Sequence, residues 1–508
     1  MMSASQHDSA NSRSRESHRS VTLRSALTTM ALLRIQVIIA LATLAAVLCL
    51  ESSLHAQTTL STTNYRHSAN VGSNSVYDYT PTIMQDGKYR MWWCGAAEGP
   101  GDNILYAEST SLSGPFTAPN GTDPYLVVFR GTNDGTSFDS EHTCDPSVIR
   151  VNGTYYMYYG GLQKDSGPLP TEIGLAQSSD GITWTRMNNG NAIIVPAELT
   201  TGNAYGAGQP SVIYLNGYFY VVYTDTTGLG GTPQETNAVY VVRSTDPTFQ
   251  SGVQELTATG FQSQTSSNHT TYALLNTASV DWTYIDSLQV FAVAEDHGSD
   301  PNNTYIHFFS TDLLSIPYNN IAVAGTWVDG PGIVTRPDKH ALPPMNSACG
   351  TTSFDFIKAT SLNGNGAPDN LQDFGVDILS GLTCASISNL VANMFEGYAI
   401  QAPGFPLTLD IGGVRLQSAS TLPIQDLTKN FINTSSEIFY DIPYGASLQV
   451  GAQALGASGR PAGFLLDNNT LWLVDSIKIL TDNSSSITTI PTSEWDTYSH
   501  GPDLHLVQ

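Results

Sequence analysis

A repeat of about 65 residues runs through the first two-thirds of the chain and constrains its fold more than any other feature. Each copy starts at a proline and continues as two short runs of β-branched and aromatic residues around an Asn-Gly or Asp-Gly pair. The copies begin at Pro81, Pro146 and Pro210, and a degenerate fourth copy covers 278–294. Asn-Gly and Asp-Gly favour tight hairpins, because both residues adopt a positive φ at little cost. Each copy therefore predicts an antiparallel hairpin.

A second marker follows each hairpin and predicts a third strand. It is a short apolar run that ends in serine, at Ser109, Ser178, Ser244, Ser310 and Ser380. Five units, each of them a four-stranded antiparallel sheet, predict a five-bladed β-propeller. We expect the segment 64–71, before the first proline, to complete the last blade.

The pattern changes at about residue 387. Two weak copies of a smaller β unit follow, at 397–448 and 463–504. The predicted fold class is therefore all-β, with a five-bladed β-propeller over 58–386 and a small β-rich C-terminal module over 387–508. This module is either an adhesion unit for glycan or cell wall, or a lid or clamp for the propeller.

The first 57 residues resemble a signal peptide with a long n-region. An apolar run at 35–50 precedes Ala56, a small residue of the type found at a cleavage site, and Met30 would make an ordinary start. The run is shorter than the roughly 20 residues of a membrane-spanning helix. A single-pass anchor is the alternative. We expect secretion to an extracellular or periplasmic location, with no membrane contact in the mature form.

Charge excludes some partners, and the cysteines indicate an oxidising compartment. With 20 basic and 44 acidic residues the net charge is −24, which disfavours nucleic acid. After residue 57 four cysteines remain, an even number that permits two disulfides in an exported protein. Propeller geometry brings Cys94 and Cys144 to one face of neighbouring blades, and the pair Cys349 and Cys384 would then staple the fifth blade. The cysteines and histidines show no zinc-binding spacing, and no metal ligand is assigned.

Propeller geometry also gathers acidic residues at one opening. The innermost strand of each blade starts on the face where the second strand ends, so the residues before Pro81, Pro146 and Pro210 converge on one funnel. The polar residues gathered there are Asp78, Asp145, Gln209, Asp225, Asp281, Glu295 and Asp296. The alternative for Asp145 is that it only initiates a turn, because Asp-Pro is common there. For Asp225 and Glu295 the alternative is an ordinary solvated acid at a strand end.

Aromatic residues and a histidine are candidates for substrate contact. Trp92 and Trp93 are adjacent on a predicted strand, so they face opposite sides. We expect one ring in the core and the other as a stacking face for a sugar. His142, just before Asp145, and Gln209 are further candidates, together with Asp281.

Three features of the chain resemble the five-bladed propeller glycoside hydrolases of family 43, which are arabinanases and β-xylosidases. These features are the repeated Pro-Ser-Val-Ile-x-x-Asn-Gly-x-Tyr-Tyr pattern, the pair Asp145-Pro146 and the segment 176–184. The resemblance extends to relatives of that family, among them the fructan hydrolases. The likeness covers roughly 65–385. It implies three acids, one before each of the first three inner strands: a base, an orienting Asp and a proton donor. Asp145 fits the second position. Thr80 holds the first, with Asp78 displaced by two residues, and Gly208-Gln209 stands where the third predicts Glu.

The favoured hypothesis is a secreted glycoside hydrolase that acts on plant or microbial polysaccharide. Asp78 is its predicted base, Asp145 tunes pKa values and positions the sugar, and Glu295 or Asp225 is the acid. Carboxyl groups that share one funnel push their pKa values apart, which supplies an acid and a base at one pH. The alternatives are a lectin-like binding propeller and a structural surface protein with a decayed site. No cofactor is expected; a central cation is compatible with such a propeller, but no ligand set identifies one.

Overall fold

The computed structural model describes residues 59–507 except for short segments. Those segments are 69–70, 72–80, 97–98, 100, 165–169, 198–204, 229–237, 265–269, 297, 343–349, 384–385, 387–389, 391–393 and 435. The predicted signal peptide, with Met30, lies outside the described residues, as do Asp78, Cys349 and Cys384. Among the described residues, no helix combines the length and hydropathy needed to cross a membrane.

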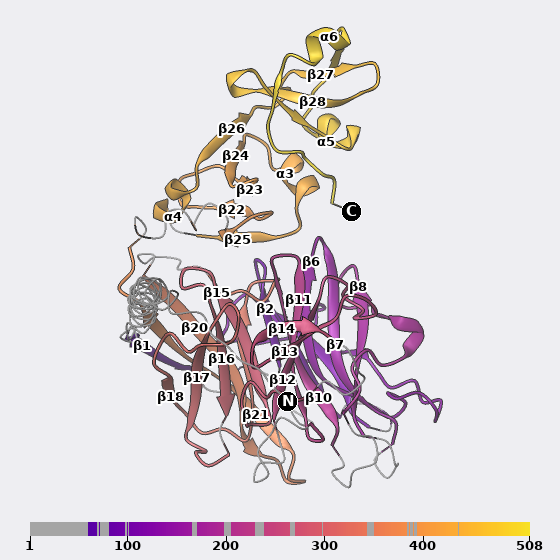
Figure 1. Cartoon of the computed structure of the whole chain (residues 1–508), viewed down its shortest axis with the longest axis vertical. Coiled ribbons are helices and arrows are strands. Elements are labelled where there is room, and N and C mark those ends of the chain that lie inside the picture. Colours follow the sequence, from indigo (N-terminus) through magenta and orange to yellow (C-terminus); the bar gives the residue numbers. More distant parts are fainter. Residues whose placement is uncertain are drawn as a thin grey trace, which may run out of the picture. The chain divides into compact units, whose positions relative to one another are not determined.

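Residues 59–379 fold into antiparallel units that follow one another along the chain (Figure 1). The first unit holds β2 (Thr82–Gln85), β3 (Tyr89–Gly95), β4 (Asn103–Ser109) and β5 (Leu126–Phe129). The second holds β6 (His142–Val151), β7 (Thr154–Leu162), β8 (Glu172–Ser178) and β9 (Thr185–Arg186), with the short helix η1 (Asn188–Gly190) after it. The third holds β10 (Ala207–Leu215), β11 (Tyr218–Asp225), β12 (Val239–Ser244), β13 (Gln254–Thr257) and β14 (Gly260–Ser263).

The next unit holds β15 (Val280–Ile285), β16 (Val290–Asp296), β17 (Asn303–Ser310) and β18 (Ile321–Ala324). The last is built from β19 (Asp329–Thr335), β20 (Thr351–Leu362) and β21 (Pro368–Leu379), and β1 (Ser61–Ser68) adds to it as an antiparallel partner of β21. The N-terminal strand therefore closes the last unit.

The first strands of the units form a closed ring. They contact one another in the order β2, β6, β10, β15 and β19, and β19 returns to β2 through a parallel pairing of Val334 with Ile83. This pairing merges the first and last units into one eight-stranded sheet. Sheets arranged around a common axis with their first strands innermost are the arrangement of a β-propeller.

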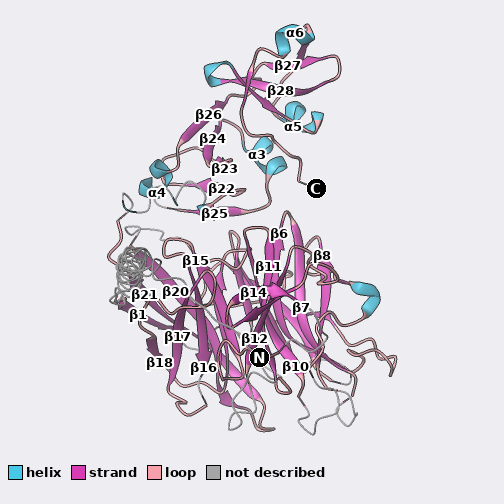
Figure 2. Ribbon diagram, viewed as in Figure 1, coloured by secondary structure: helices cyan, strands magenta, loops and turns pink. Residues whose placement is uncertain are grey.

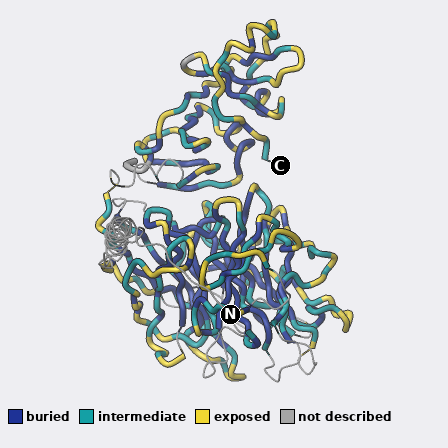
Figure 3. Tube along the Cα trace, viewed as in Figure 1, coloured by how far each residue is buried: buried dark blue, intermediate teal, exposed yellow. Residues whose placement is uncertain are grey.

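The core lies between adjacent sheets. In Figure 3 burial follows the strands, and the exposed positions lie mainly in the loops. One cluster joins Ile149 and Tyr158 of the second unit to Val221 and Tyr223 of the third. Because the residues on the two faces of a strand alternate, each unit contributes apolar side chains to two such clusters.

Residues 394–507 contain two sheets with the same strand order, and most of the short helices (Figure 2). The first sheet holds β22 (Ala399–Gln401), β23 (Thr408–Ile411), β24 (Val414–Ser418), β25 (Phe431–Asn433) and β26 (Tyr444–Leu448), with α3 (Thr421–Leu427) and α4 (Ser436–Asp441). The second holds β27 (Ala454–Ala457), β28 (Arg460–Leu466), β29 (Thr470–Leu473), β30 (Ile487–Thr489) and β31 (Ser499–His500), with η2 (Asp467–Asn469), α5 (Ile477–Asp482) and α6 (Thr492–Trp495). The sequence pattern predicts that the second copy starts at Gly463, but in the structure it starts earlier, at β27.

Two buried arginines at the ends of inner strands bond to this C-terminal part. Arg336 donates to the carbonyl of Met394 at 2.8 Å, and its guanidinium lies over the ring of Tyr398. Arg150 donates to the carbonyl of Lys429 at 2.8 Å. Each arginine lies at the C-terminal end of its inner strand, whereas Asp145 lies near the start of β6.

Candidate functional site

The inner strands bulge where the sequence repeats its Xaa-Pro pair. The register of β6 shifts between Cys144 and Ser147, and that of β10 shifts between Gly208 and Ser211. At these bulges Asp145 has a φ of 48° and Gln209 a φ of 49°. Proline lacks the N–H that a regular ladder needs, so a bulge is where a strand tolerates it. A left-handed conformation in a non-glycine residue costs roughly 1–3 kcal/mol and is often found at functional sites.

The starts of four inner strands meet around a small cavity, here called the axial cavity. Its volume is about 20 Å³, enough for about one water molecule. It is lined by Pro81, Thr82, Asp145, Pro146, Ser147, Gln209, Pro210, Ser211, Ser279, Val280, Asp281 and Lys339. The structure therefore brings Asp145, Gln209 and Asp281 together, as the repeat predicts.

Asp145 has the properties of a carboxyl group that exchanges a proton at mildly acidic pH. Its Oδ2 accepts a hydrogen bond from Tyr205 Oη at 3.2 Å. Burial raises the pKa of Asp145 to about 6, and the negative charge of Asp102 acts in the same direction, against the lowering effect of the Tyr205 hydroxyl and the Gln209 N–H. A group with such a pKa supplies and regains protons at the pH where many hydrolases operate.

Gln209 occupies the position in the third unit that Asp145 holds in the second. Its Oε1 accepts a hydrogen bond from Thr224 Oγ1 at 3.1 Å, and the same hydroxyl contacts the carbonyl of Ala278. The side chain thus links the third and fourth units at the rim of the axial cavity. An amide cannot transfer a proton as a carboxylic acid does, so this position offers hydrogen bonding alone.

Asp281 is a structural residue, which corrects the expectation that it contacts substrate. It is buried, and its Oδ1 accepts bonds from Lys339 Nζ at 2.6 Å and from Ser211 Oγ at 2.5 Å. Its Oδ2 accepts from the N–H of Ile333 at 2.7 Å. These three bonds tie the third and fourth units to the last one, and the sequence pattern contains no signal for the lysine.

The fourth unit contributes two buried acids. Glu295 Oε1 lies 2.8 Å from His307 Nε2. Asp296, its neighbour, faces the other side of the strand, where Thr304 donates to it and Lys358 Nζ lies 3.9 Å away. Burial raises the pKa of Asp296 to about 6, and burial lowers that of Lys358 to about 8. Asp296 is therefore a candidate alongside Glu295.

Asp225 is held in a turn rather than presented at the axis. Its Oδ2 accepts from the N–H of Ala197 at 2.8 Å, and its Oδ1 accepts from the N–H and the hydroxyl of Thr227 at 2.8 and 2.7 Å. Its side chain is buried. This corrects the expectation of a proton donor there, because both oxygens are committed as acceptors to local groups.

Both tryptophans belong to the core, which corrects the expectation of a stacking face. Trp92 and Trp93 are each 0% exposed. Trp92 donates from Nε1 to the carbonyl of Gly181 at 2.8 Å, and Trp93 packs in the cluster that contains Met91 and Leu105. The two rings face opposite sides of β3, as adjacent strand residues must, but a neighbouring sheet covers each side.

The predicted disulfide between Cys94 and Cys144 is confirmed. Their Cα atoms are 4.8 Å apart, and the bond joins the end of β3 to the start of β6, one residue before Asp145. His142 lies beside it, with its Nδ1 3.0 Å from Asp102 Oδ2. Asp102 also lies near both sulfur atoms, but a disulfide leaves no thiolate to bind a metal.

The comparisons with known proteins agree with the resemblance to arabinanases over a limited span. No protein-family model matches the chain. Arabinan endo-1,5-alpha-L-arabinosidase A of Aspergillus niger is 30% identical over 126 residues, which is 24% of this chain and 34% of that protein. The chain thus spans about a third of the length of the curated relatives it matches.

Two solved structures of glycoside hydrolases are similar to the chain at a low level. One is Zg3597, a family 117 glycoside hydrolase of Zobellia galactanivorans, with a TM-score of 0.43 and 11% identity over 63% of this chain and 91% of that one. The other is the alpha-L-arabinofuranosidase PaAbf62A of Podospora anserina, with a TM-score of 0.40 and 12% identity over 63% and 98%.

Proposed function

We propose that this chain is a secreted glycoside hydrolase that acts on a neutral plant or microbial polysaccharide, with an arabinose-containing polymer as the first substrate to test. The observation that carries the proposal is Asp145: a partly buried carboxyl group on a strained bulge, at the start of an inner strand, with its pKa raised to about 6. The sequence similarity to an arabinanase supports the choice of polymer.

In the proposed reaction Asp145 is the proton donor, a role that replaces the pKa tuning assigned to it from the sequence and takes the place of Glu295 or Asp225 as the acid. It passes its proton to the glycosidic oxygen while the bond from that oxygen to the anomeric carbon breaks. In a single displacement, water attacks the carbon and a second carboxylate takes up its proton. In a double displacement, a carboxylate nucleophile attacks the carbon first, and the deprotonated Asp145 then takes up the proton of the water that releases the sugar. Asp78 stays the predicted base. Tyr205 positions the Asp145 carboxyl through its hydroxyl, and Gln209 binds a sugar hydroxyl through its amide.

The architecture in this proposal is a five-bladed propeller with an accessory module. The eight-stranded sheet counts as two blades joined through β19 and β2, which makes five with the other three sheets of the ring. Residues 58–386 form the propeller, 387–508 the module and 1–57 the signal peptide. The ammonium of Lys339 pairs with Asp281 at the axis, so we infer that the fold needs no central cation there.

A specific observation favours one alternative, a carbohydrate-binding propeller without catalysis. The third inner strand carries Gly208-Gln209 before Pro210, where the resemblance predicts a proton-donating Glu two residues before the proline. In that case the carboxyl group of Asp145 would bind sugar hydroxyls and catalyse nothing.

The test is release of sugar from a panel of polysaccharides: linear arabinan, arabinoxylan, xylan, fructan and mannan. The protein is the chain from Gln57 onward, assayed beside Asp145→Asn. The matched control is Asp503→Asn, an exposed aspartate of the C-terminal part. We expect sugar from at least one polymer with wild type and the control, and a loss of at least about a hundredfold with Asp145→Asn, because general acid catalysis contributes about 10²–10⁴-fold.

Release of sugar by Asp145→Asn at the wild-type rate would refute the role of Asp145. No release from any polymer, with retardation of the wild type in a gel that contains one of them, would favour the binding protein.

A further inference from the structure

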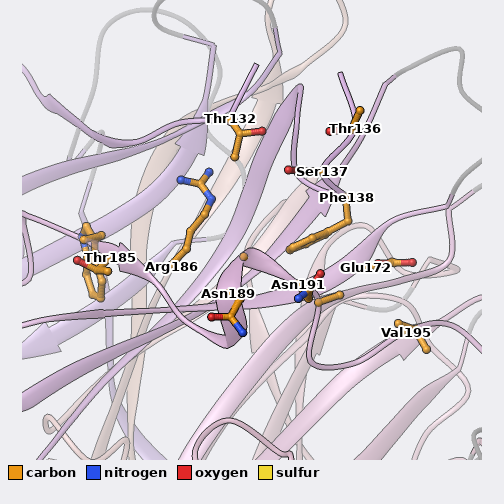
Figure 4. Close-up of a pocket in the computed structure, with 13 residues that line it drawn as sticks. Thr132, Thr136, Ser137, Phe138, Glu172, Thr185, Arg186, Asn189, Asn191 and Val195 are labelled. Carbon is orange, nitrogen blue, oxygen red and sulfur yellow. The ribbon is translucent and has the colours of Figure 1, made fainter. Parts of the chain in front are cut away.

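A second cleft lies at the edge of the second unit, and the reaction proposed above makes no use of it. It has a volume of about 950 Å³ and lies between the loop 132–138 and strands β8 and β9. The side chains around it include Phe138, Arg186 and Asn189, which surround one hollow in Figure 4. We call it the rim cleft.

Phe138 forms a flat platform in the rim cleft. Two glycines on adjacent strands, Gly161 of β7 and Gly174 of β8, leave the space for its ring: a Cβ on either would lie 2.5–2.6 Å from a ring atom. The ring stacks on Tyr159 at a centroid distance of 6.1 Å and stays partly exposed. An aromatic ring held against a strand in this way suits the apolar C–H face of a sugar.

The loop that carries Phe138 is held in place before any ligand arrives. The carboxylate of Asp134 accepts from the N–H groups of Thr136 and Ser137, both at 2.7 Å. The side chain of Gln163, at the end of β7, donates to the carbonyl of Thr136 at 3.0 Å. A platform fixed beforehand reduces the ordering cost of binding.

Arg186 is fixed at one wall, with its charge already balanced. Its Nε donates to Asp139 Oδ2 at 2.7 Å, and Asp139 is completely buried. Its Nη2 donates to the carbonyl of Arg130, and the guanidinium lies 4.2 Å from the centre of the Phe129 ring. The remaining guanidinium N–H groups can donate to an uncharged oxygen such as a sugar hydroxyl.

The other polar groups of the rim cleft are amides, hydroxyls and one carboxyl group. Asn189 is exposed and has a φ of 55°, and Asn191 and Thr185 also line the cleft. Burial raises the pKa of Glu172. With Arg186 paired to Asp139, Glu172 leaves the lining with a negative charge when it ionises. A neutral, hydroxyl-rich ligand fits this lining, and a polyanion such as a uronic acid polymer does not.

The rim cleft and Asp145 lie on opposite faces of the second unit's sheet, near the start of β8. Thr171 Cγ2 and Asp145 Oδ2 are each 3.6 Å from where a Cβ on Gly160 would lie. Thr171 therefore faces the Asp145 side. Glu172 follows it and, by the alternation of strand residues, faces the other side, where it lines the rim cleft.

We propose that the rim cleft binds a neutral oligosaccharide segment, as a distal subsite for a polymer whose reacting bond lies at Asp145. Phe138 stacks on a sugar ring, and Arg186 and Asn189 hydrogen-bond its hydroxyls. The distal role rests on the proposed function, whereas the binding of glycan by the cleft does not.

The test compares two variants of the cleft with a control. Phe138→Ala removes the platform. Asn189→Gly removes an exposed amide at a position where glycine keeps the left-handed backbone at no steric cost, so folding is preserved. Tyr65→Ala, at a 53% exposed aromatic of β1, is the control. Affinity gels hold linear arabinan, arabinoxylan or polygalacturonate, and hydrolysis of arabinan is compared with that of arabinotriose.

We expect wild type and Tyr65→Ala to be retarded by at least one neutral polymer and not by polygalacturonate. Phe138→Ala should weaken this binding about tenfold and Asn189→Gly about threefold. If sugar is released, both cleft variants should raise KM for the polymer, with kcat and the rate on arabinotriose unchanged.

Retardation of both cleft variants equal to that of the wild type would overturn the proposal, as would the absence of retardation of the wild type by every neutral polymer. Wild-type binding that both variants lose, without any release of sugar, would support glycan binding by the cleft while the proposed hydrolase function fails. Sugar release with an unchanged KM in both variants would support the hydrolase function and overturn the role of the rim cleft as a distal subsite.

Discussion

The axial pair of Lys339 and Asp281 is predicted to be a major contributor to the stability of the propeller. Both side chains are buried, and Lys339 Nζ lies 2.6 Å from Asp281 Oδ1. At an effective dielectric constant of about 20, Coulomb's law gives an attraction of roughly 6 kcal/mol at this separation. Desolvation of both charges offsets part of it. Removal of one partner of a buried pair typically costs about 3–5 kcal/mol, because the other charge stays buried without compensation.

Lys339→Met is therefore expected to lower the free energy of unfolding by about 3–5 kcal/mol. After this change the Asp281 carboxylate keeps only the bonds from Ser211 and the N–H of Ile333. The measurement is urea unfolding followed by tryptophan fluorescence, with the linear extrapolation of the unfolding free energy to water. The control is Lys164→Met, at an exposed lysine just after β7, for which no resolvable change is expected.

A double-mutant cycle makes the prediction sharper. In Lys339→Met/Asp281→Asn no charge stays buried, so the double variant should be more stable than the sum of the two single losses implies. A loss below about 1 kcal/mol in Lys339→Met, or simple additivity in the double variant, would refute the argument. Asp281 would then again be a candidate for contact with substrate.

Three further predictions concern pH and the disulfide. Activity that depends on protonated Asp145 should fall as the pH rises through about 6. The hydrogen bond from Tyr205 lowers the pKa of Asp145, so its removal in Tyr205→Phe should raise that pKa and move this limb of the pH–rate profile to higher pH. A limb that does not move would contradict the assignment. Burial, with the charge of Glu396, raises the pKa of Asp410 to about 8. The folded chain then keeps a proton that the unfolded chain releases, so stability falls between about pH 4 and pH 8. Asp410→Asn should raise Tm at pH 8 and leave it nearly unchanged at pH 4, as measured by calorimetry. Replacement of both Cys94 and Cys144 by Ser opens a link between residues 50 positions apart and should cost about 2–4 kcal/mol in urea unfolding; equal stability of the two forms would argue against the bond.

Local sequence signals predicted the strand hairpins well. The Asn-Gly pairs at Asn152 and Asn216 both lie in the turns between first and second strands, and both asparagines have a positive φ. The information is local, because a two-residue turn and the alternation of its flanking strands are encoded within about 15 residues. The period of the repeat then sets which strands begin a unit.

The candidate site was predicted in part. The Asp145-Pro146 pair marks its own bulge, since proline removes a ladder hydrogen bond wherever the pair stands. For Asp225, the sequence contains no signal that distinguishes a structural acid from a functional one. Its turn partners are close in the chain, but Ala197, which donates to its second oxygen, lies 28 residues away.

The sequence by itself determined the repeat, the all-β class, the inner strands with their Xaa-Pro starts and the pairing of Cys94 with Cys144, because each depends on local turn chemistry or on a period read along the chain. Tertiary structure alone decided which side chains remain open to a ligand. Trp92 and Trp93 are covered by neighbouring sheets, Asp281 is neutralised by a lysine 58 residues further on, and Phe138 is partly exposed over two glycines of adjacent strands. These outcomes depend on contacts between residues distant in sequence, which neither composition nor spacing encodes.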